Sequence, residues 1–201
     1  LKALQAGEFI YERPTLGETA YTFKHALTQE VAYNSLLMER RRFLHERTGE
    51  ALEALFKERI DDHLAELAHH YSRTANTRKA VEYLFRAGSQ AATRSAYSEA
   101  VTRLSSALVF LKRLPDQAER ARLELSVQSV LGRSLANVKG YAAAELEPVY
   151  ARARELCAQI RDPALAFRPL YGQWLFRCWK LELDKAMELA DELLAAAEDV
   201  K

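Results

Sequence analysis

The sequence predicts a mainly α-helical protein made of stacked helical hairpins, with a short β segment near its start. Three observations lead to this fold class. Apolar residues recur at helical spacing over most of the chain from residue 39 onward. A glycine in similar surroundings recurs at positions 88, 132 and 172. The first 38 residues are instead rich in aromatic and β-forming residues.

The composition excludes several classes of protein. The 29 basic and 28 acidic residues nearly cancel, so no global field draws the chain to nucleic acid or to a membrane. The chain is 49% hydrophobic with 7 Gly and 5 Pro, which argues against disorder. No apolar run is long enough to span a bilayer. Cys157 and Cys178 fall on expected apolar helix faces, where free thiols are normal in a reducing compartment, so we expect a cytoplasmic protein.

The first 38 residues predict a β-hairpin followed by one helix. Residues 8–13 and 19–24 read as strands, and residues 14–18 (PTLGE) contain the Pro and Gly of a turn. The helix is expected to begin near Thr28. A hairpin and one helix cannot bury a core alone. We therefore assign residues 1–38 to the carboxy-terminal part of a small domain whose beginning precedes Leu1.

From residue 39 onward the apolar pattern predicts only helices. Gly49 lies inside the first of them and costs about 1 kcal/mol relative to Ala, which is tolerable where a neighbouring helix packs on it. Asp61 and Asp62 are expected to start the second helix. Further helices are expected over 78–93, 97–112, 118–138, 146–160, 167–178 and 186–197. The residues expected to face inward are Leu44, Thr48, Ala51, Leu52 and Leu55 in the first helix, Leu64, Leu67, Ala68 and Tyr71 in the second, Phe167, Leu170, Tyr171, Trp174, Leu175 and Cys178 in the seventh, and Ala186, Met187, Ala190, Leu193, Leu194 and Ala197 in the last.

The recurring glycine predicts stacked helix pairs. The stretches FRAGSQAA, SVLGRSLA and PLYGQWLF surround Gly88, Gly132 and Gly172 at spacings of 44 and 40 residues. Such a period is typical of repeats that each bury an apolar face against a neighbour. The first unit resembles the tetratricopeptide pattern, because small or apolar residues stand where two helices approach closely. An ordinary helical bundle is the alternative. The residues that carry the likeness are Leu84, Ala87, Gly88, Ala100, Leu104 and Ala107.

Seven segments together resemble one known family. They are YTFKHALTQEVAYNSLL, RRRFLHERTGEALE, LAELAHHY, AVEYLFRAGSQAA, LPDQAERARLEL, GYAAAELEPVYARARELC and LYGQWLF. Their order is similar to the region after the ATPase module in bacterial signalling ATPases of the STAND class, many of which carry a class III adenylate/guanylate cyclase domain. The resemblance implies that residues 1–38 end a winged helix and that residues 39–201 form a tetratricopeptide-like arm. It also implies ATP or ADP as the nucleotide of the parent protein.

No catalytic motif is present in this chain. It contains no Gly-Lys pair and therefore no G-x-x-x-x-G-K-[ST] phosphate loop, and nothing looks like the paired metal-binding aspartates of a cyclase. We expect a non-enzymatic region without a cofactor of its own, whatever the parent catalyses.

His25 is the candidate nucleotide-sensing residue. In STAND proteins a winged-helix histidine can touch the nucleotide phosphate and hold the resting state, and the Phe-Lys-His stretch at a strand end resembles that position. An imidazole suits this role because it donates a hydrogen bond to an anion and titrates near neutral pH. The alternative is a histidine that bonds a backbone carbonyl at the domain junction.

A partner-binding groove is the second candidate site. In tetratricopeptide arrays the first helix of each pair lines the concave groove. The resulting face is polar with two arginines, which suits an acidic peptide or a carboxylate group. The alternative is that this face packs against the protein's own next domain. The positions are Phe85, Ser89, Ser129, Arg133, Asn137, Gln173 and Arg177.

Two polar clusters give weaker signals. His63, Glu66 and His70 share a helix face, but about 10 Å separates the two histidines, so we expect polar surface and no metal site. Arg40–Arg42 form the only basic run. No aromatic platform accompanies it, so we expect these arginines to cap the preceding helix or to contact the ATPase domain, not nucleic acid.

The two tryptophans lie near the end of the arm. Trp174 is on the apolar stripe and is expected in the core, whereas Trp179 is off the stripe and is expected to be exposed.

These readings combine into one functional expectation. The chain would be a non-catalytic, regulatory and protein-interaction region of a signal-transduction ATPase or adenylate cyclase, coupling partner binding to the nucleotide state. The partner would be a protein, a peptide or the parent's own ATPase domain, with no nucleic acid and no membrane. The alternatives are a free-standing tetratricopeptide adaptor, the sensor arm of an ATP-dependent transcription regulator, and a metal hydrolase at the helix of His63 and His70.

Overall fold

The computed structural model describes residues 1–14, 19–160 and 163–198 and is mainly α-helical. It begins with α1 (Lys2–Ala6), β1 (Ile10–Pro14), β2 (Thr19–Phe23) and α2 (Ala26–Asn34). The two strands pair antiparallel, with Ile10 opposite Phe23 and Pro14 opposite Thr19. The predicted hairpin is confirmed, while most of its turn lies outside the described residues. Helix α2 begins at Ala26, not near Thr28, because the extended backbone of His25 already provides the amino-terminal cap position.

The segment before residue 38 buries almost nothing by itself. Ile10 is its single buried hydrophobic residue among those described, and α2 contains none. Leu27 and Val31 on α2 are 70% and 61% exposed. An isolated nine-residue helix is marginal in water. The expectation that a hairpin and one helix do not make a core is therefore confirmed.

Helix α3 (Met38–Leu55) buries a different face from the predicted one. Its buried residues are His45 and Gly49, while Leu44 and Leu55 are 38% and 68% exposed. The buried stripe is thus rotated by about one residue from Leu44, Thr48, Ala51, Leu52 and Leu55, of which only Leu52 packs against the core. A side chain on Gly49 would lie 2.8 Å from Cζ of Tyr71, so the close approach of the next helix selects this face.

The next two elements are a 3-10 segment, η1 (Lys57–His63), and α4 (Leu64–Tyr71). Asp61 and Asp62 lie in the 3-10 segment, so the helix starts later than predicted. The inward face is nevertheless correct, because all four predicted residues of α4 are buried: Leu64, Leu67, Ala68 and Tyr71.

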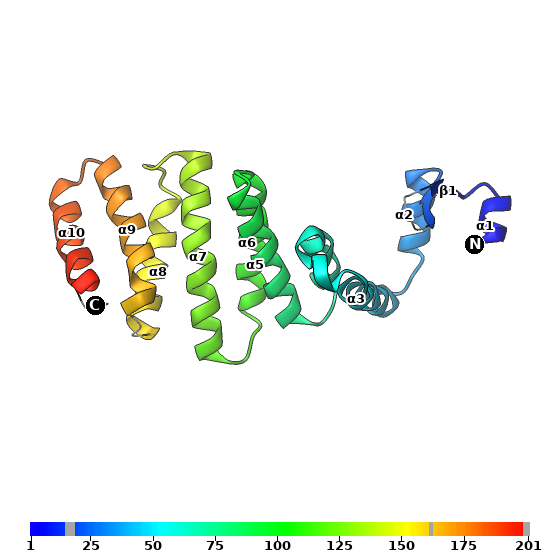
Figure 1. Cartoon of the computed structure of the whole chain (residues 1–201), viewed down its shortest axis with the longest axis horizontal. Coiled ribbons are helices and arrows are strands. Elements are labelled where there is room, and N and C mark those ends of the chain that lie inside the picture. The colour runs from blue at the N-terminus through cyan, green and yellow to red at the C-terminus, as the bar shows by residue number, and fades with distance from the viewer. Residues whose placement is uncertain (15–18, 161–162, 199–201) are drawn as a thin grey trace.

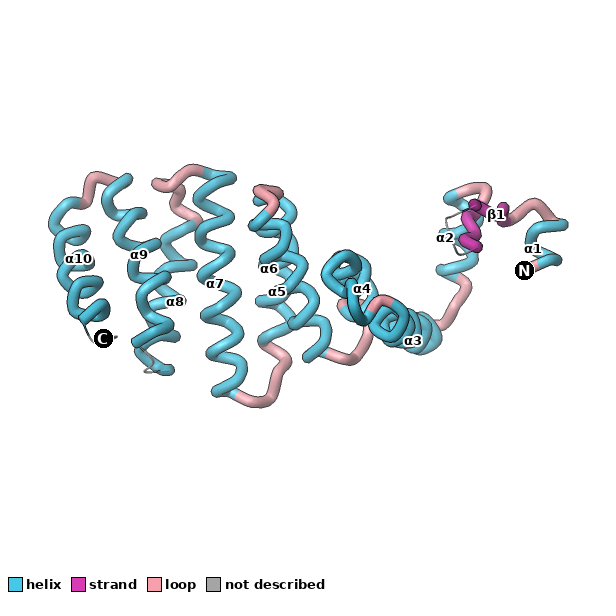
Figure 2. The backbone as a smooth tube through the Cα atoms, viewed as in Figure 1, coloured by secondary structure: helices cyan, strands magenta, loops and turns pink. Residues whose placement is uncertain are grey.

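Six longer helices complete the described chain and stand side by side in Figures 1 and 2. They are α5 (Thr77–Thr93), α6 (Tyr97–Leu111), α7 (Gln117–Lys139), α8 (Leu146–Ile160), α9 (Pro163–Trp179) and α10 (Leu183–Glu198). Sequence signals set several ends. The Asn76 side chain accepts the N–H of Lys79 at the start of α5, Asp116 caps α7, and Gly140 at φ +95° ends α7. The predicted bounds of α5 to α8 are confirmed to within one or two residues.

The predicted inward faces of the last two helices are partly wrong. On α9, Phe167 and Tyr171 are each 48% exposed, whereas Phe176 is 1% exposed. On α10, Leu189 is buried, while Met187 and Leu194 are 69% and 65% exposed. Both helices carry two adjacent apolar stripes, and packing against α8 and α9 selects one of them.

The hairpins α5–α6, α7–α8 and α9–α10 follow one another in a row. Helix α5 contacts α7, and α7 contacts α9, whereas in the described part α6 and α8, and α8 and α10, make no comparable contact. The first helices therefore lie together on one side of the row, which we call the first-helix side. Helices α6, α8 and α10 define the second-helix side.

The recurring glycines mark close helix contacts. A side chain on Gly88 of α5 would lie 2.8 Å from Leu104 of α6. Gly132 of α7 and Gly172 of α9 both face the ring of Tyr150 on α8, where added side chains would lie 2.8 and 2.6 Å from Cε1. The third glycine thus packs on the preceding hairpin. In the described residues, no helix is long and apolar enough to cross a membrane.

Candidate functional site

His25 lies at the junction of strand and helix that the sequence predicts. Strand β2 ends at Phe23, and His25 precedes the first turn of α2 in an extended conformation. Its carbonyl accepts the N–H groups of Thr28 and Gln29 at 3.1 and 3.3 Å. The imidazole is exposed and makes no hydrogen bond to the helix end. The ring is therefore free to meet a group outside the described chain.

An arginine clamps the carboxyl end of α2 to the start of α3. The Arg41 guanidinium donates to the carbonyls of Asn34 at 2.7 Å and Leu36 at 2.9 Å, and to the Asn34 side chain at 3.3 Å. It also lies 4.8 Å from the centre of the Tyr33 ring. Of the run Arg40–Arg42, Arg41 thus caps the preceding helix as predicted. Cationic donors suit the free carbonyls at a helix end.

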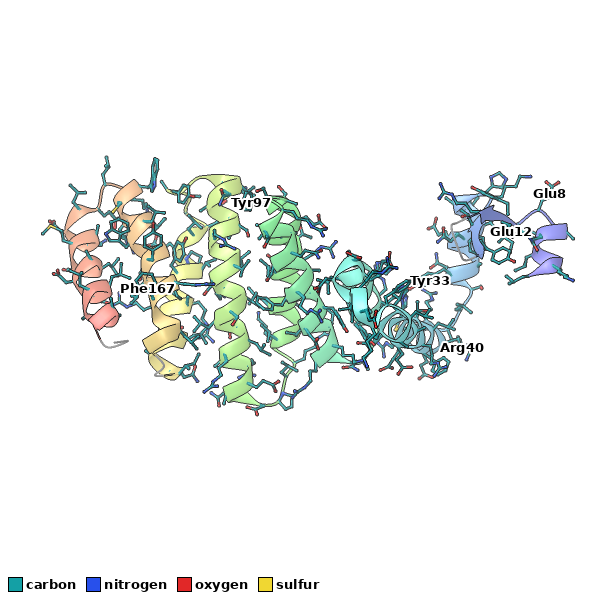
Figure 3. The ribbon with its side chains drawn as sticks, viewed as in Figure 1. Glu8, Glu12, Tyr33, Arg40, Tyr97 and Phe167 are labelled. Atoms are coloured by element: carbon teal, nitrogen blue, oxygen red, sulfur yellow. The ribbon has the colours of Figure 1, made fainter. Side chains whose placement is uncertain are left out.

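A chain of hydrogen bonds continues from α2 into the helical row. Tyr33 Oη lies 3.0 Å from His45 Nε2, and His45 Nδ1 lies 3.0 Å from His70 Nδ1 of α4. Figure 3 shows Tyr33 at the place where α2 meets α3. We call the contacts of Arg41 together with this chain the joint. It is the link between the amino-terminal segment and the hairpins.

The histidines of the joint are held neutral. Burial is the largest cause that lowers the pKa of His45 to about 4, and the charges of the neighbouring His70, Arg73 and His69 lower it further. Burial likewise lowers the pKa values of His69 and His70. In the neutral state one imidazole nitrogen donates and the other accepts, which matches a chain that runs through both nitrogens of His45. The joint is therefore a polar contact that depends on neutral histidine.

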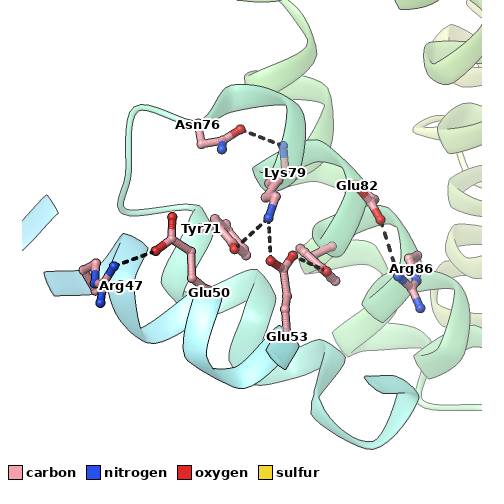
Figure 4. Close-up of polar contacts among 9 residues, drawn as sticks. Arg47, Glu50, Glu53, Tyr71, Asn76, Lys79, Glu82 and Arg86 are labelled. Atoms are coloured by element: carbon pink, nitrogen blue, oxygen red, sulfur yellow. Dashed lines mark hydrogen bonds and ion pairs between the residues drawn. The ribbon is translucent and has the colours of Figure 1, made fainter. Parts of the chain in front are cut away.

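A second polar cluster fixes α3 to the hairpins (Figure 4). The Lys79 ammonium donates to Glu53 at 2.5 Å and to Tyr71 Oη at 3.1 Å, and Tyr83 Oη donates to Glu53 at 2.5 Å. Burial alone would raise the pKa of Glu53, but the hydrogen bonds from Lys79 and Tyr83 lower it below its ordinary value. These contacts tie α3 to α4 and α5.

The predicted groove residues on the first-helix side are mostly engaged within the chain. Ser129 Oγ donates to the Leu125 carbonyl at 2.8 Å, and Asn137 Nδ2 donates to the Arg133 carbonyl at 2.8 Å. Phe85 packs against the core, and with Ser89 it lines a shallow cleft of about 300 Å³.

The two groove arginines differ in availability. The Arg177 guanidinium donates to Glu182 at 2.7 Å and to Glu147 at 3.0 Å, and its side chain is 14% exposed. Arg133 is exposed and has no carboxylate partner in the described chain. The amide oxygen of Gln173 is buried without a described partner. Of the two arginines predicted to line the groove, Arg133 is therefore the one without a carboxylate partner among the described residues.

The two histidines of the candidate metal cluster, His63 and His70, have separate partners. His63 stacks on Phe56 at 3.8 Å and lies 3.2 Å from Glu66, while His70 turns away to His45. Over residues 1–14, 19–160 and 163–198, no three His, Cys, Asp or Glu residues are placed to hold a metal ion.

Trp179 and the two cysteines lie in their expected environments, whereas Trp174 does not. Trp179 is 60% exposed and stacks on Tyr141, while Trp174, expected in the core, is half-buried. Cys157 and Cys178 are half-buried free thiols.

Sequence reasoning missed the joint. Tyr33 and His70 lie 12 and 25 residues from His45, so spacing along one helix does not connect them. The available signal was a histidine on a helix whose glycine, Gly49, stands four residues later on the same face.

Comparison with known proteins adds a distant relative. No protein-family model matches the chain, and no solved structure matches it. The chain is 28% identical over 185 residues to an uncharacterized protein of Rhizobium meliloti (strain 1021). The match covers 90% of this chain but 18% of the relative, so the chain spans less than a fifth of that protein's length.

Proposed function

We propose that the chain is a non-catalytic regulatory region of a multidomain signal-transduction ATPase, some of which carry an adenylate cyclase domain. Residues 1–38 would complete a winged helix, and residues 39–201 would form a tetratricopeptide-like arm that contacts a protein or peptide partner. The observation that carries the proposal is the joint. A segment with almost no core of its own is clamped by Arg41 and Tyr33 to α3, and Glu53 of α3 binds Lys79 of the first hairpin. The distant relative supports it, because the matching region there is a small part of a much longer polypeptide.

The joint gives a route from the arm to His25. Helix α2 has 9 residues and is therefore about 13 Å long. His25 stands at one end of it, and Arg41 clamps the other end. A partner on the arm that favours a different position of α3 would tilt α2 and move His25 relative to a nucleotide phosphate. Such coupling needs a partner whose affinity differs between the two positions.

The proposal is tested in the full-length protein. The proposal requires that the full-length protein contains, outside the present chain, a phosphate-binding loop with Lys and Ser or Thr. The rate of ADP dissociation is then measured for the wild type, His25→Ala and the control His63→Ala. Loss of one charge-assisted hydrogen bond costs about 1.5–3 kcal/mol, so His25→Ala should release ADP at least about tenfold faster. An unchanged rate would contradict the sensing role of His25. If the full-length protein has no phosphate loop, a free-standing tetratricopeptide adaptor becomes the favoured function.

A further inference from the structure

A cleft on the second-helix side is a separate candidate binding site. It encloses about 460 Å³ and is lined by residues of α6, α7 and α8. Helix α7 contributes Arg120, Glu124 and Gln128, and α8 contributes Arg152. The groove residue Arg133 stands nine positions after Glu124, which is two and a half helical turns at about 3.6 residues per turn. The cleft therefore lies on the opposite side of α7 from the predicted groove.

Two of the cations that line the cleft have no carboxylate partner among the described residues. Arg152 donates to Glu124 at 2.6 and 3.0 Å and to Glu155 at 2.9 Å, so these three groups satisfy one another. Lys112 is exposed and Arg120 is half-buried. In the described part of the chain neither has a carboxylate within ion-pair distance, and Arg120 has only a 3.4 Å contact to the carbonyl of Leu114.

The side-chain oxygen of a buried glutamine at the same cleft lacks a partner among the described residues. Gln128 is 8% exposed, and its side-chain oxygen has no hydrogen-bond partner in the described structure. A buried polar atom left unpaired costs about 1–3 kcal/mol. Leu108 and Leu111 provide an apolar wall beside it. Among the described residues, the cleft thus combines two cations without a carboxylate partner, an unpaired buried acceptor and apolar surface.

From these features we infer that the cleft binds a short acidic peptide segment of a partner protein. Carboxylates of the peptide would pair with Lys112 and Arg120. A backbone N–H of the peptide would donate to the side-chain oxygen of Gln128, and an apolar side chain would lie on Leu108. Peptide is the class that supplies all three groups at adjacent positions. The inference concerns a face other than the proposed groove and does not depend on nucleotide coupling.

The test uses the peptide acetyl-Leu-Glu-Glu-amide, titrated by calorimetry and NMR at low salt. We expect saturable binding with a Kd below about 1 mM. The double variant Lys112→Ala/Arg120→Ala should weaken binding about tenfold, and Gln128→Leu about fivefold. The matched control is Arg122→Ala, which removes an exposed arginine from another face of α7 and should leave the Kd within about twofold.

Four results would overturn the inference. They are absence of binding at about 1 mM peptide, equal affinity of the double variant and the wild type, an equal loss in Arg122→Ala, and binding of N-acetylglutamate as tight as that of the peptide. The last result would identify a small carboxylate as the ligand. Urea unfolding of Gln128→Leu checks that the fold is kept, and the surface double variant tests the cleft without disturbing the core.

Discussion

The buried histidine of the joint makes stability depend on pH. His45 has its pKa lowered from 6.5 to about 4 in the folded chain. The unfolded chain therefore binds a proton more readily, and stability is full above pH 6.5 and is lost as the pH falls toward 4. At pH 5, a site with these two pKa values lowers the free energy of unfolding by about 2 kcal/mol relative to neutral pH. His69 and His70 titrate in the same direction and add to this loss.

The assay is urea unfolding at pH 7.5 and pH 5.0. The wild type should lose at least about 2 kcal/mol of unfolding free energy between the two pH values through the joint histidines. His45→Gln should lose about 2 kcal/mol less than the wild type, since its amide does not titrate. His25→Gln, which removes an exposed histidine, is the control and should behave as the wild type. Equal losses in His45→Gln and the wild type would show that His45 does not cause the pH dependence.

Two further predictions concern packing. Glu53→Gln removes the carboxylate that binds Lys79, and should lower the unfolding free energy by about 1–3 kcal/mol. The control Glu50→Gln, in an exposed ion pair, should change it by less than about 1 kcal/mol. Equal effects of the two variants in urea titrations would contradict the buried cluster. Gly132→Ala should cost about 1–3 kcal/mol because the added carbon meets the ring of Tyr150. A thermal melt unchanged by that substitution would show that the two helices are not in close contact.

The sequence predicts the elements well because their signals are local. Caps such as Asn76 and Asp116 and the glycine that ends α7 fix helix bounds within a few neighbouring residues. The strands follow from their residue types in the same way. The hairpin order follows from the recurrence of Gly88 and Gly132, each of which contacts the second helix of its own pair.

The inward faces are harder to predict, because neighbouring helices select them. On α3 the leucines predict one stripe, but Tyr71 packs on Gly49 and turns His45 inward. On α9, Gly172 packs on Tyr150 and so leaves Tyr171 exposed. Periodicity defines a face to within about one residue, and one residue turns a helix by about 100°.

The candidate site is predictable only in part, for the same reason. His25 stands at its predicted junction, because that junction is a local feature. Arg177 is engaged in part by Glu147, which lies 30 residues away along the chain, whereas Arg133 has no carboxylate partner in the described residues. Which of the two arginines is paired with a carboxylate can be told only from the tertiary structure.

We propose that the arm controls the amino-terminal segment through the joint. The most direct measurement is the ADP dissociation rate of the full-length protein in Arg41→Ala, with hydrogen exchange of residues 26–34 measured in parallel. The control is Arg40→Ala, which removes an exposed arginine that lies over the ring of Phe43. We expect faster exchange in α2 and faster ADP release in Arg41→Ala, with both unchanged in Arg40→Ala. Faster exchange in α2 with an unchanged rate of ADP release would contradict control through the joint.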